Sequence, residues 1–493
     1  MLIWLKRNYF CVGFGALLFL FALSLPNRAL NIDDPWLAET SYWVAKVGYA
    51  RSTLLWGINN YEILDLNYHK LWVLIGALFW KTFGFTVTVF KSVGLLFFFI
   101  FLVGFYYYFR DREKEYSLRD FWIGAFLIWS TNLVFNYSFV FRPEIGIMAV
   151  GFWGFFFFRK SILQSNWKKM LVAGLLFGLC VPLHIKGSVY PMTAGLFLLL
   201  FHRHLKSILA LGIGVVAGIL PYFWDITSIE RLQFWYKQFS NNPVVHSMPK
   251  TIWYYILKPL QEHKRFFHQE HEIAFSLLFF VCLLIFYKPL KKYLDIEVKF
   301  LFLTVIGMGA TSHSMTDKSL LLYYPFMVLV VVTALKIMPV KSRTIPILLA
   351  LSLLVNMAMN IRLVLKSDRN VAQRSAIAAA QIGKKNVKVM ADISFIFNEM
   401  DNYEIYGAQN YTFTCAFYTG EIPTIDRYFE YAKKFGVEFI VFDTVSMSGE
   451  EEELFKNVDL SVGKEVKNFR VKYNYDGITV LEKFKELDLA EKS

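Results

Sequence analysis

Long apolar runs recur through the first three quarters of this chain, and many of them reach about 17–25 residues. A helix of that length crosses the hydrocarbon core of a bilayer, because each residue adds about 1.5 Å to its axis. The composition agrees, since 56% of the 493 residues are hydrophobic and 18% are aromatic, with a mean hydropathy of +0.41. Soluble enzymes do not carry such an excess. The sequence therefore predicts an α-helical polytopic membrane protein.

Basic residues cluster at alternate ends of these runs, which is the pattern that sets orientation in a membrane. We expect about eleven spans, at approximately 9–26, 86–109, 121–138, 145–159, 170–183, 188–202, 207–224, 273–287, 300–312, 319–336 and 345–363. Every connection assigned to the cytoplasm contains Lys or Arg, and this accounts for the formal net charge of +13 without a nucleic-acid partner. An uncleaved first span and an odd number of spans place the N-terminus in the cytoplasm and the C-terminus outside.

The chain divides into two expected domains. Residues 1–366 form the multi-span part, with a first outer loop at 27–85 and a second at 225–272; the amphipathic stretches 36–50 and 70–83 are expected to lie in the membrane interface. Residues 367–493 have a soluble composition and form a small α/β domain on the non-cytoplasmic face. Its expected strands are 387–390, 412–417, 438–442 and 478–481, with a helix at 424–436.

Polar residues gather at the outer ends of the expected spans, where charge is costly unless it has a role. The set comprises Asp33, Asp34, Glu39, Lys70, Arg142, Glu144, Lys186, Lys318, Tyr323 and Tyr324. Cations at one depth can hold a lipid-linked phosphate while the lipid lies among the spans. Carboxylates beside them can act as a general base or hold a divalent cation such as Mg or Mn. These residues therefore predict a cleft that binds an anion and moves a proton.

Structural explanations remain open for the same residues: helix capping for Asp33 and Asp34, pairing with Arg142 for Glu144, interfacial placement for Lys70 and Lys186, and neutralisation by Asp317 for Lys318. The four cysteines and the outer histidines His69, His184 and His313 match no metal-ligand spacing. No P-loop or dinucleotide motif is present. The sequence thus indicates no nucleotide-binding site and no definite cofactor, and it does not decide whether the protein binds a metal ion.

Four segments, in order along residues 30–330, resemble the GT-C superfamily of membrane glycosyltransferases. Within it they are most similar to the bacterial branch of protein mannosyltransferases and lipid A aminoarabinose transferases. Asp33–Ala38 resembles the family's Asp-Glu-Ala-x-Tyr-Ala segment, and Tyr68–Trp72, continuing to Phe83-Gly84, resembles its Lys-Pro-Pro-Leu-x-Tyr-Trp stretch. Arg142-Pro143-Glu144 resembles its Arg-Pro-Asp/Glu segment. His184–Gly187 with Pro191, and Lys318 with Tyr323–Pro325, resemble its Thr-Lys-Gly-Pro and Lys-x-x-x-Tyr-x-x-Pro segments.

That resemblance implies a GT-C-like bundle in the bacterial inner membrane and an inverting transfer of a sugar from a polyprenyl-phosphate donor to a hydroxyl of a lipid, glycan or protein. Asp33 takes the position of the general base and Glu144 that of the second acid, while Lys70, Arg142, Lys186, Lys318 and Tyr324 would contact the donor phosphate. Asp34 in place of Glu, and the missing Pro-Pro after Lys70, leave open which aspartate is the base and which sugar and acceptor are used.

Two other classes of function fit part of the pattern. A carrier or flippase for a lipid-linked sugar also needs a cationic cleft, but it should place charges along the middle of its path. A structural scaffold of the cell envelope would use the C-terminal domain as its contact module. Few charges lie within the expected spans, which favours the transferase over the carrier.

Overall fold

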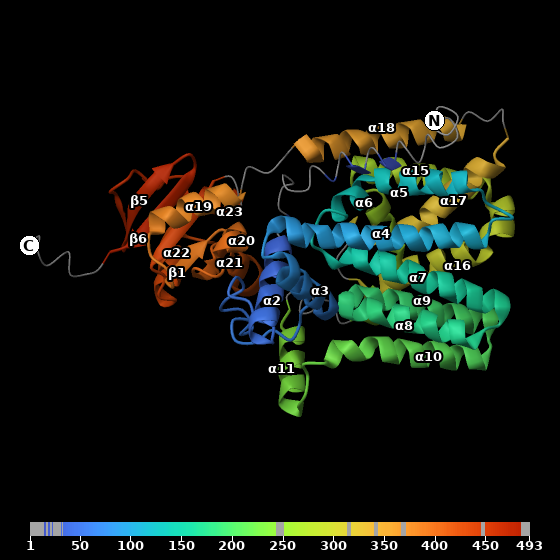
Figure 1. The fold of residues 1–493 in the computed structure, drawn as a ribbon, viewed down its shortest axis with the longest axis horizontal. Coiled ribbons are helices and arrows are strands. Elements are labelled where there is room, and N and C mark those ends of the chain that lie inside the picture. Colours follow the sequence, from blue (N-terminus) through green and yellow to red (C-terminus); the bar gives the residue numbers. More distant parts are fainter. Residues whose placement is uncertain are drawn as a thin grey trace, which may run out of the picture.

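The computed structural model describes residues 14–15, 18–19, 22, 31, 33–242, 251–312, 317–339, 344–365, 371–444 and 449–484. Most of the expected first span (9–26) and His313 lie outside this part of the chain. Figure 1 shows a bundle of long, roughly parallel helices with a sheet region at one end. The short helices α2 (Asp33–Val47) and α3 (Lys70–Phe83) lie where the two parts meet.

Helices occupy every expected span position from residue 86 onward. They are α4 (Val87–Asp111), α5 (Leu118–Ser130), α6 (Asn132–Tyr137), α7 (Pro143–Gln164), α8 (Trp167–Leu183), α9 (Val189–Phe197), α10 (Leu205–Ile219), α15 (Glu270–Ile285), α16 (Tyr287–Thr311), α17 (Tyr324–Ile337) and α18 (Thr344–Leu365). Four helices in the described part are long and apolar enough to cross a membrane alone, or five if a pair bent by 107° is one span. These helices mark a multi-pass membrane protein, while the expected count of about eleven is not confirmed.

Small residues let two of these helices approach closely. Gly174 and Gly178 on α8 face Gly214 and Gly218 on α10. A Cβ on Gly174 would lie 2.4 Å from the carbonyl oxygen of Leu211, so a larger residue would force the helices apart. Glycines four residues apart on both helices are typical of helix pairs inside membranes, where backbone contact replaces the hydrophobic driving force.

The C-terminal region contains a six-stranded sheet of order β2-β1-β3-β6-β5-β4. Its strands are β1 (Lys388–Ala391), β2 (Glu404–Gly407), β3 (Phe439–Asp443), β4 (Glu465–Val466), β5 (Phe469–Tyr475) and β6 (Ile478–Lys483). β1 pairs in parallel with β2 and β3, and the other pairs are antiparallel. With α19 (Val371–Ile382) and α22 (Ile425–Lys434), the sheet forms an α/β unit.

One expected strand is wrong. Residues 412–417 belong to the helix α21 (Gln409–Thr414) and to the π-helical turn Cys415–Thr419 that continues it. Tyr411 and Cys415, four residues apart, both enter the core of the sheet region. A helical repeat of buried residues therefore overrides the β-propensity of the intervening Thr and Phe.

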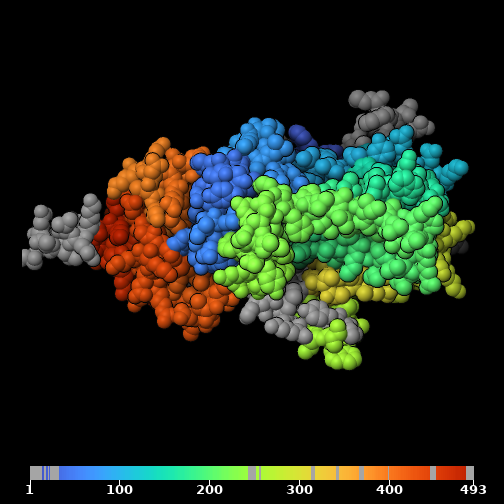
Figure 2. Space-filling view, turned by 90° about the horizontal axis from the view of Figure 1, so that it is seen from below, coloured from blue at the N-terminus to red at the C-terminus, as the bar shows by residue number. Residues whose placement is uncertain are grey.

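The sheet region is joined to α2 and to the loop that follows it. The Tyr42 hydroxyl donates to Asp401 Oδ1 at 2.6 Å, and Lys46 pairs with the same carboxylate at 2.9 Å. Farther along, the carbonyl of Trp56 accepts hydrogen bonds from Asn410 at 2.5 Å and Tyr431 at 3.0 Å. In Figure 2 the orange and red sheet region lies directly against the blue segment that contains α2 and the loop after it.

Candidate active site

Asp33, the first residue of α2, lies between two cations from distant parts of the chain. Its Oδ2 pairs with Nη1 of Arg142, the residue before α7. The same oxygen is 3.5 Å from Nζ of Lys318, on the short helix Asp317–Leu322. The Asp33 side chain keeps 22% of its surface exposed. The structure thus brings three of the sequence-predicted residues together around one accessible carboxylate, at what we call the site end of the bundle.

Glu144 holds the other side of the Arg142 guanidinium. Nε of Arg142 donates to Oε2 of Glu144 at 3.0 Å, and Nη2 donates to Oε1 at 2.7 Å. Pro143 starts α7, so Glu144 falls in the first helical turn, where the helix dipole favours a carboxylate. A two-point contact fixes the plane of the guanidinium. Glu144, which is buried, therefore aims Nη1 of Arg142 at Asp33.

Asp34 points away from this cluster and into the protein. Its Oδ1 accepts from the backbone N–H of Phe141 at 2.7 Å, and its Oδ2 accepts from that of Asn31 at 3.0 Å. Burial raises the pKa of the Asp34 carboxyl to about 6, although the nearby Lys91 and the two backbone donors oppose the shift. Asp34 connects the start of α2 to the segment before α7. The two adjacent aspartates therefore have different surroundings.

Lys186 lies in the turn Ile185–Ser188 between α8 and α9. Its backbone N–H donates to Nδ1 of His184 at 3.0 Å, and the His184 ring stacks on His69 with centroids 4.3 Å apart. Burial lowers the pKa of the Lys186 ammonium to about 8; Glu144 opposes this shift, and the cations around it, Arg265 first, add to it. Lys186 therefore belongs to the electrostatic environment of Arg142 and Glu144.

Arg265 is a cation of this region that the sequence analysis did not single out. It is fully buried on α14 (His263–Phe266), where its Nε donates to both carboxylate oxygens of Glu262 at 3.0 and 2.9 Å. Its Nη1 donates to the hydroxyl of Ser319, next to Lys318, at 3.0 Å. In the sequence Arg265 is one of several cations in a long loop, so only the fold distinguishes it.

Lys70 occupies a separate polar cluster. The fully buried Nζ pairs with Oδ1 of Asp225, whose Oδ2 accepts from the Tyr68 hydroxyl at 3.0 Å. Nζ also lies 4.9 Å from the centroid of the Tyr222 ring. The charge of Lys70 is therefore balanced within the protein by a residue of the expected second outer loop. No contact between Lys70 and Asp33 is found among the described residues.

Tyr324, the first residue of α17, packs its buried ring against Phe275, with centroids 5.3 Å apart. The adjacent Tyr323 donates its hydroxyl to Glu262 at 3.2 Å and so joins the Arg265 environment. Within the described ranges, no three His, Cys, Asp or Glu residues lie together in an arrangement that could hold a metal ion.

No protein-family model and no curated protein matches this sequence. Solved structures do match. ArnT from Cupriavidus metallidurans bound to undecaprenyl phosphate superposes with a TM-score of 0.65 at 12% identity, covering 97% of this chain and 99% of that one. Its apo state gives 0.63 at 11% identity, covering 97% and 98%. These are GT-C transferases.

The chain has the GT-C fold.

The arabinofuranosyltransferase AftD from Mycobacteria also matches, with a TM-score of 0.51 at 10% identity. That match covers 97% of this chain but 40% of the larger AftD chain. The expected fold class, a GT-C-like helical bundle with a C-terminal α/β region, is thereby confirmed.

Proposed function

We propose that this protein is a membrane glycosyltransferase that moves a sugar from a polyprenyl-phosphate donor to a hydroxyl acceptor. The observation that carries the proposal is the accessible Asp33 carboxylate held between Arg142 and Lys318. This arrangement places a base, Asp33, next to two cations that can bind a phosphate, Arg142 and Lys318. The GT-C fold adds support, because ArnT, which shares it, has been crystallised with undecaprenyl phosphate.

Asp33 acts as the general base. It takes the proton of the acceptor hydroxyl as the hydroxyl oxygen attacks the anomeric carbon of the donor sugar. The bond from that carbon to the phosphate oxygen breaks in the same displacement, so the configuration inverts. We assign this role to Asp33 rather than Asp34, because both oxygens of Asp34 accept backbone hydrogen bonds inside the protein.

Arg142 and Lys318 stabilise the negative charge that grows on the departing phosphate. Glu144 keeps the guanidinium in its plane, so little reorganisation is needed when the donor binds. Lys186 adds a further positive charge, and Arg265 supports the segment that carries Lys318 through Ser319. For Lys70 we propose a structural role instead of phosphate binding, because Asp225 already neutralises it.

The reaction is proposed to occur on the non-cytoplasmic face of a bacterial inner membrane, with residues 367–493 in the periplasm or outside the cell. The acceptor is a hydroxyl of a lipid, a glycan or a protein.

The proposal is tested with the full-length protein in proteoliposomes and a panel of polyprenyl-phosphate sugars. Mass spectrometry of lipid extracts should show a transferred sugar with the wild-type protein and its loss in Asp33→Asn. The carrier alternative gives a different result: labelled donor would cross the bilayer without release of polyprenyl phosphate. Donor movement without any transfer in the whole panel would therefore overturn the proposal.

A further inference from the structure

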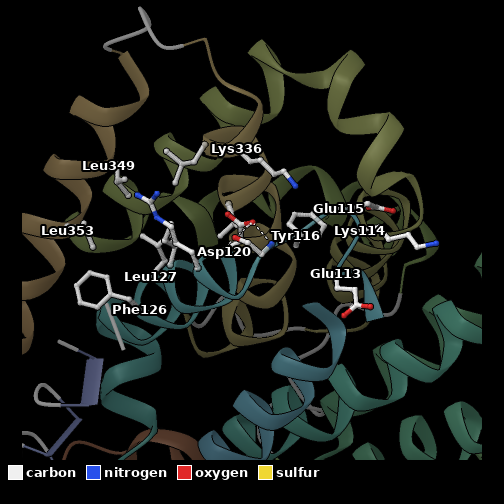
Figure 3. Close-up of a pocket in the computed structure, with 15 residues that line it drawn as sticks. Glu113, Lys114, Glu115, Tyr116, Asp120, Phe126, Leu127, Lys336, Leu349 and Leu353 are labelled. Atoms are coloured by element: carbon white, nitrogen blue, oxygen red, sulfur yellow. Dashed lines mark hydrogen bonds between the residues drawn. The ribbon is translucent and has the colours of Figure 1, made fainter. Parts of the chain in front are cut away.

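A cavity of about 730 Å³ opens between α5, α17 and α18 (Figure 3). It lies at the end of the bundle opposite Asp33. The separation follows from α7, which begins beside Arg142 at the site end. Lys160, near the other end of α7, pairs with Asp111 at 2.7 Å, and Asp111 ends α4 just before the connection that lines the cavity. The seventeen helical rises from Pro143 to Lys160 add up to about 26 Å, close to the thickness of a bilayer core.

The walls of this cavity are apolar and come from three helices. They comprise Ile123, Phe126, Leu127, Val332, Leu335, Leu349 and Leu353. Figure 3 shows Phe126, Leu127, Leu349 and Leu353 together on one side of the space. A volume of this size lies within the usual range for pockets that hold a small molecule.

Beyond the cavity, α18 is hydrogen-bonded to the bundle near its C-terminal end. There Asn356 Oδ1 accepts from the backbone N–H of Asn132 at 2.7 Å. Asn360 accepts at Oδ1 from the Asn132 side chain and donates from Nδ2 to the carbonyl of Ser130, both at 2.9 Å. Toward its N-terminal half, α18 instead presents Leu349 and Leu353 to the cavity.

The rim of the cavity is charged. It carries Lys114, Arg119 and Lys336 together with Glu113, Glu115 and Asp120. Two of these carboxylates already serve the protein: Asp120 accepts from the backbone N–H and hydroxyl of Ser117 at 2.7 and 2.9 Å, and Glu115 pairs with Arg112. The exposed Lys336 lies over the Tyr116 ring, 4.8 Å from its centroid. Glu113 is also exposed at the rim, and the exposed Lys336 and Lys114 border the apolar walls.

We propose that this cavity binds one glycerophospholipid with an anionic headgroup. Lys336 and Lys114 contact the phosphate, and the first part of an acyl chain lies on Leu349, Leu353 and Phe126. Cations above an apolar wall match the two halves of such a lipid, and anionic headgroups attract basic residues at a membrane surface. The site lies at the end of the bundle opposite Asp33, so it is distinct from the proposed transfer site and does not depend on it.

Native mass spectrometry of the full-length protein, titrated with phosphatidylglycerol or phosphatidylcholine, tests the proposal. Wild type should retain one phosphatidylglycerol more tightly than phosphatidylcholine. Lys336→Glu should weaken phosphatidylglycerol binding by about fivefold or more, the usual worth of one basic residue at a membrane surface. Leu353→Trp, which fills the cavity, should reduce it further.

Two matched controls keep the result specific. Leu351→Trp changes an apolar residue of α18 that is 52% exposed and does not line the cavity, and Lys288→Glu changes an exposed lysine at the start of α16. Both should bind phosphatidylglycerol as wild type does. Equal losses in cavity and control variants, equal binding of both lipids, or displacement of the lipid by soluble glycerol 3-phosphate would each overturn the proposal. Because the readout is lipid mass, failure here leaves the transferase proposal untouched.

Discussion

Glu144 binds Arg142 through both carboxylate oxygens, at 3.0 and 2.7 Å, and the remaining guanidinium nitrogen of Arg142 reaches Asp33. Glu144 thus orients the Arg142 guanidinium, which lies beside Asp33. In a buried pair of this kind, the geometry of the cation depends on the carboxylate behind it.

The two aspartates at the start of α2 should respond differently to the same change. Asp33→Asn should lower turnover by about 10²–10⁴-fold, the usual contribution of a positioned base, and should leave the protein folded, because Glu144 still pairs with Arg142. Asp34→Ala should remove the acceptor of two backbone N–H groups and destabilise the protein by about 1–3 kcal/mol. Transfer assays and thermal melts separate the two effects. Full turnover in Asp33→Asn with loss only in Asp34→Asn would assign the base to Asp34 instead.

Glu144→Gln keeps the size of the side chain and removes its charge. The guanidinium of Arg142 would then be held less firmly, and we expect kcat/KM for the donor to fall by about 10- to 100-fold, as for other residues that support a charged ligand. Glu115→Gln, which changes an acid paired with Arg112 at the opposite end, serves as the control. Equal kinetics in both variants would show that Glu144 does not orient Arg142.

Donor binding should weaken at alkaline pH because of Lys186. Its pKa is lowered to about 8 by burial, so the ammonium is mostly charged at about pH 7 and mostly neutral at about pH 9. A positive charge attracts the donor phosphate, and KM should therefore rise as the pH passes through about 8. Lys186→Arg stays charged throughout and should abolish the rise. A pH profile of KM that is identical in wild type and Lys186→Arg would contradict this role.

The Lys70–Asp225 pair should be structural. Asp225→Asn leaves a buried ammonium without its counter-ion, and loss of one partner of such a pair costs about 3–5 kcal/mol. The double variant Lys70→Met, Asp225→Leu removes both charges and should regain most of that stability. Thermal unfolding in detergent measures both. If the double variant is stable but its KM for the donor is greatly raised, Lys70 contacts the phosphate after all.

The order and orientation of the expected spans predicted which polar residues would lie at the same end of the bundle. Asp33, Arg142 and Lys318 were assigned to the same ends of their helices, and in the folded chain they meet. The hydropathy pattern could not predict the direction of individual side chains. Asp34 turns inward because the backbone N–H groups of Asn31 and Phe141 donate hydrogen bonds to it. Lys70 is balanced by a residue 155 positions away, in a loop whose fold no periodicity describes.

For the fold, the sequence predicted the long helices but not every short element. Hydropathy located the helices, because a long apolar run has few alternatives in a membrane. Short elements failed where local propensity and tertiary packing disagree, as for residues 412–417, which form a helix because Tyr411 and Cys415 face the same core. The buried role of Arg265 arises only once the chain places Glu262 and Ser319 around it.

The joint between sheet and helices has a mechanical consequence. The buried carboxylate of Glu39 accepts hydrogen bonds from the backbone and hydroxyl of Thr53 at 2.6 and 2.8 Å, and a Cβ on Gly407 of β2 would lie 2.8 Å from the carbonyl of Leu54. A displacement of the sheet would therefore also move the loop that contains Thr53 and Leu54, and this loop is hydrogen-bonded to α2, whose first residue is Asp33. Removal of residues 367–493 is therefore expected to change the position of α2, and with it the Asp33 carboxylate, because Tyr42 and Lys46 of the same helix would lose Asp401 as their partner.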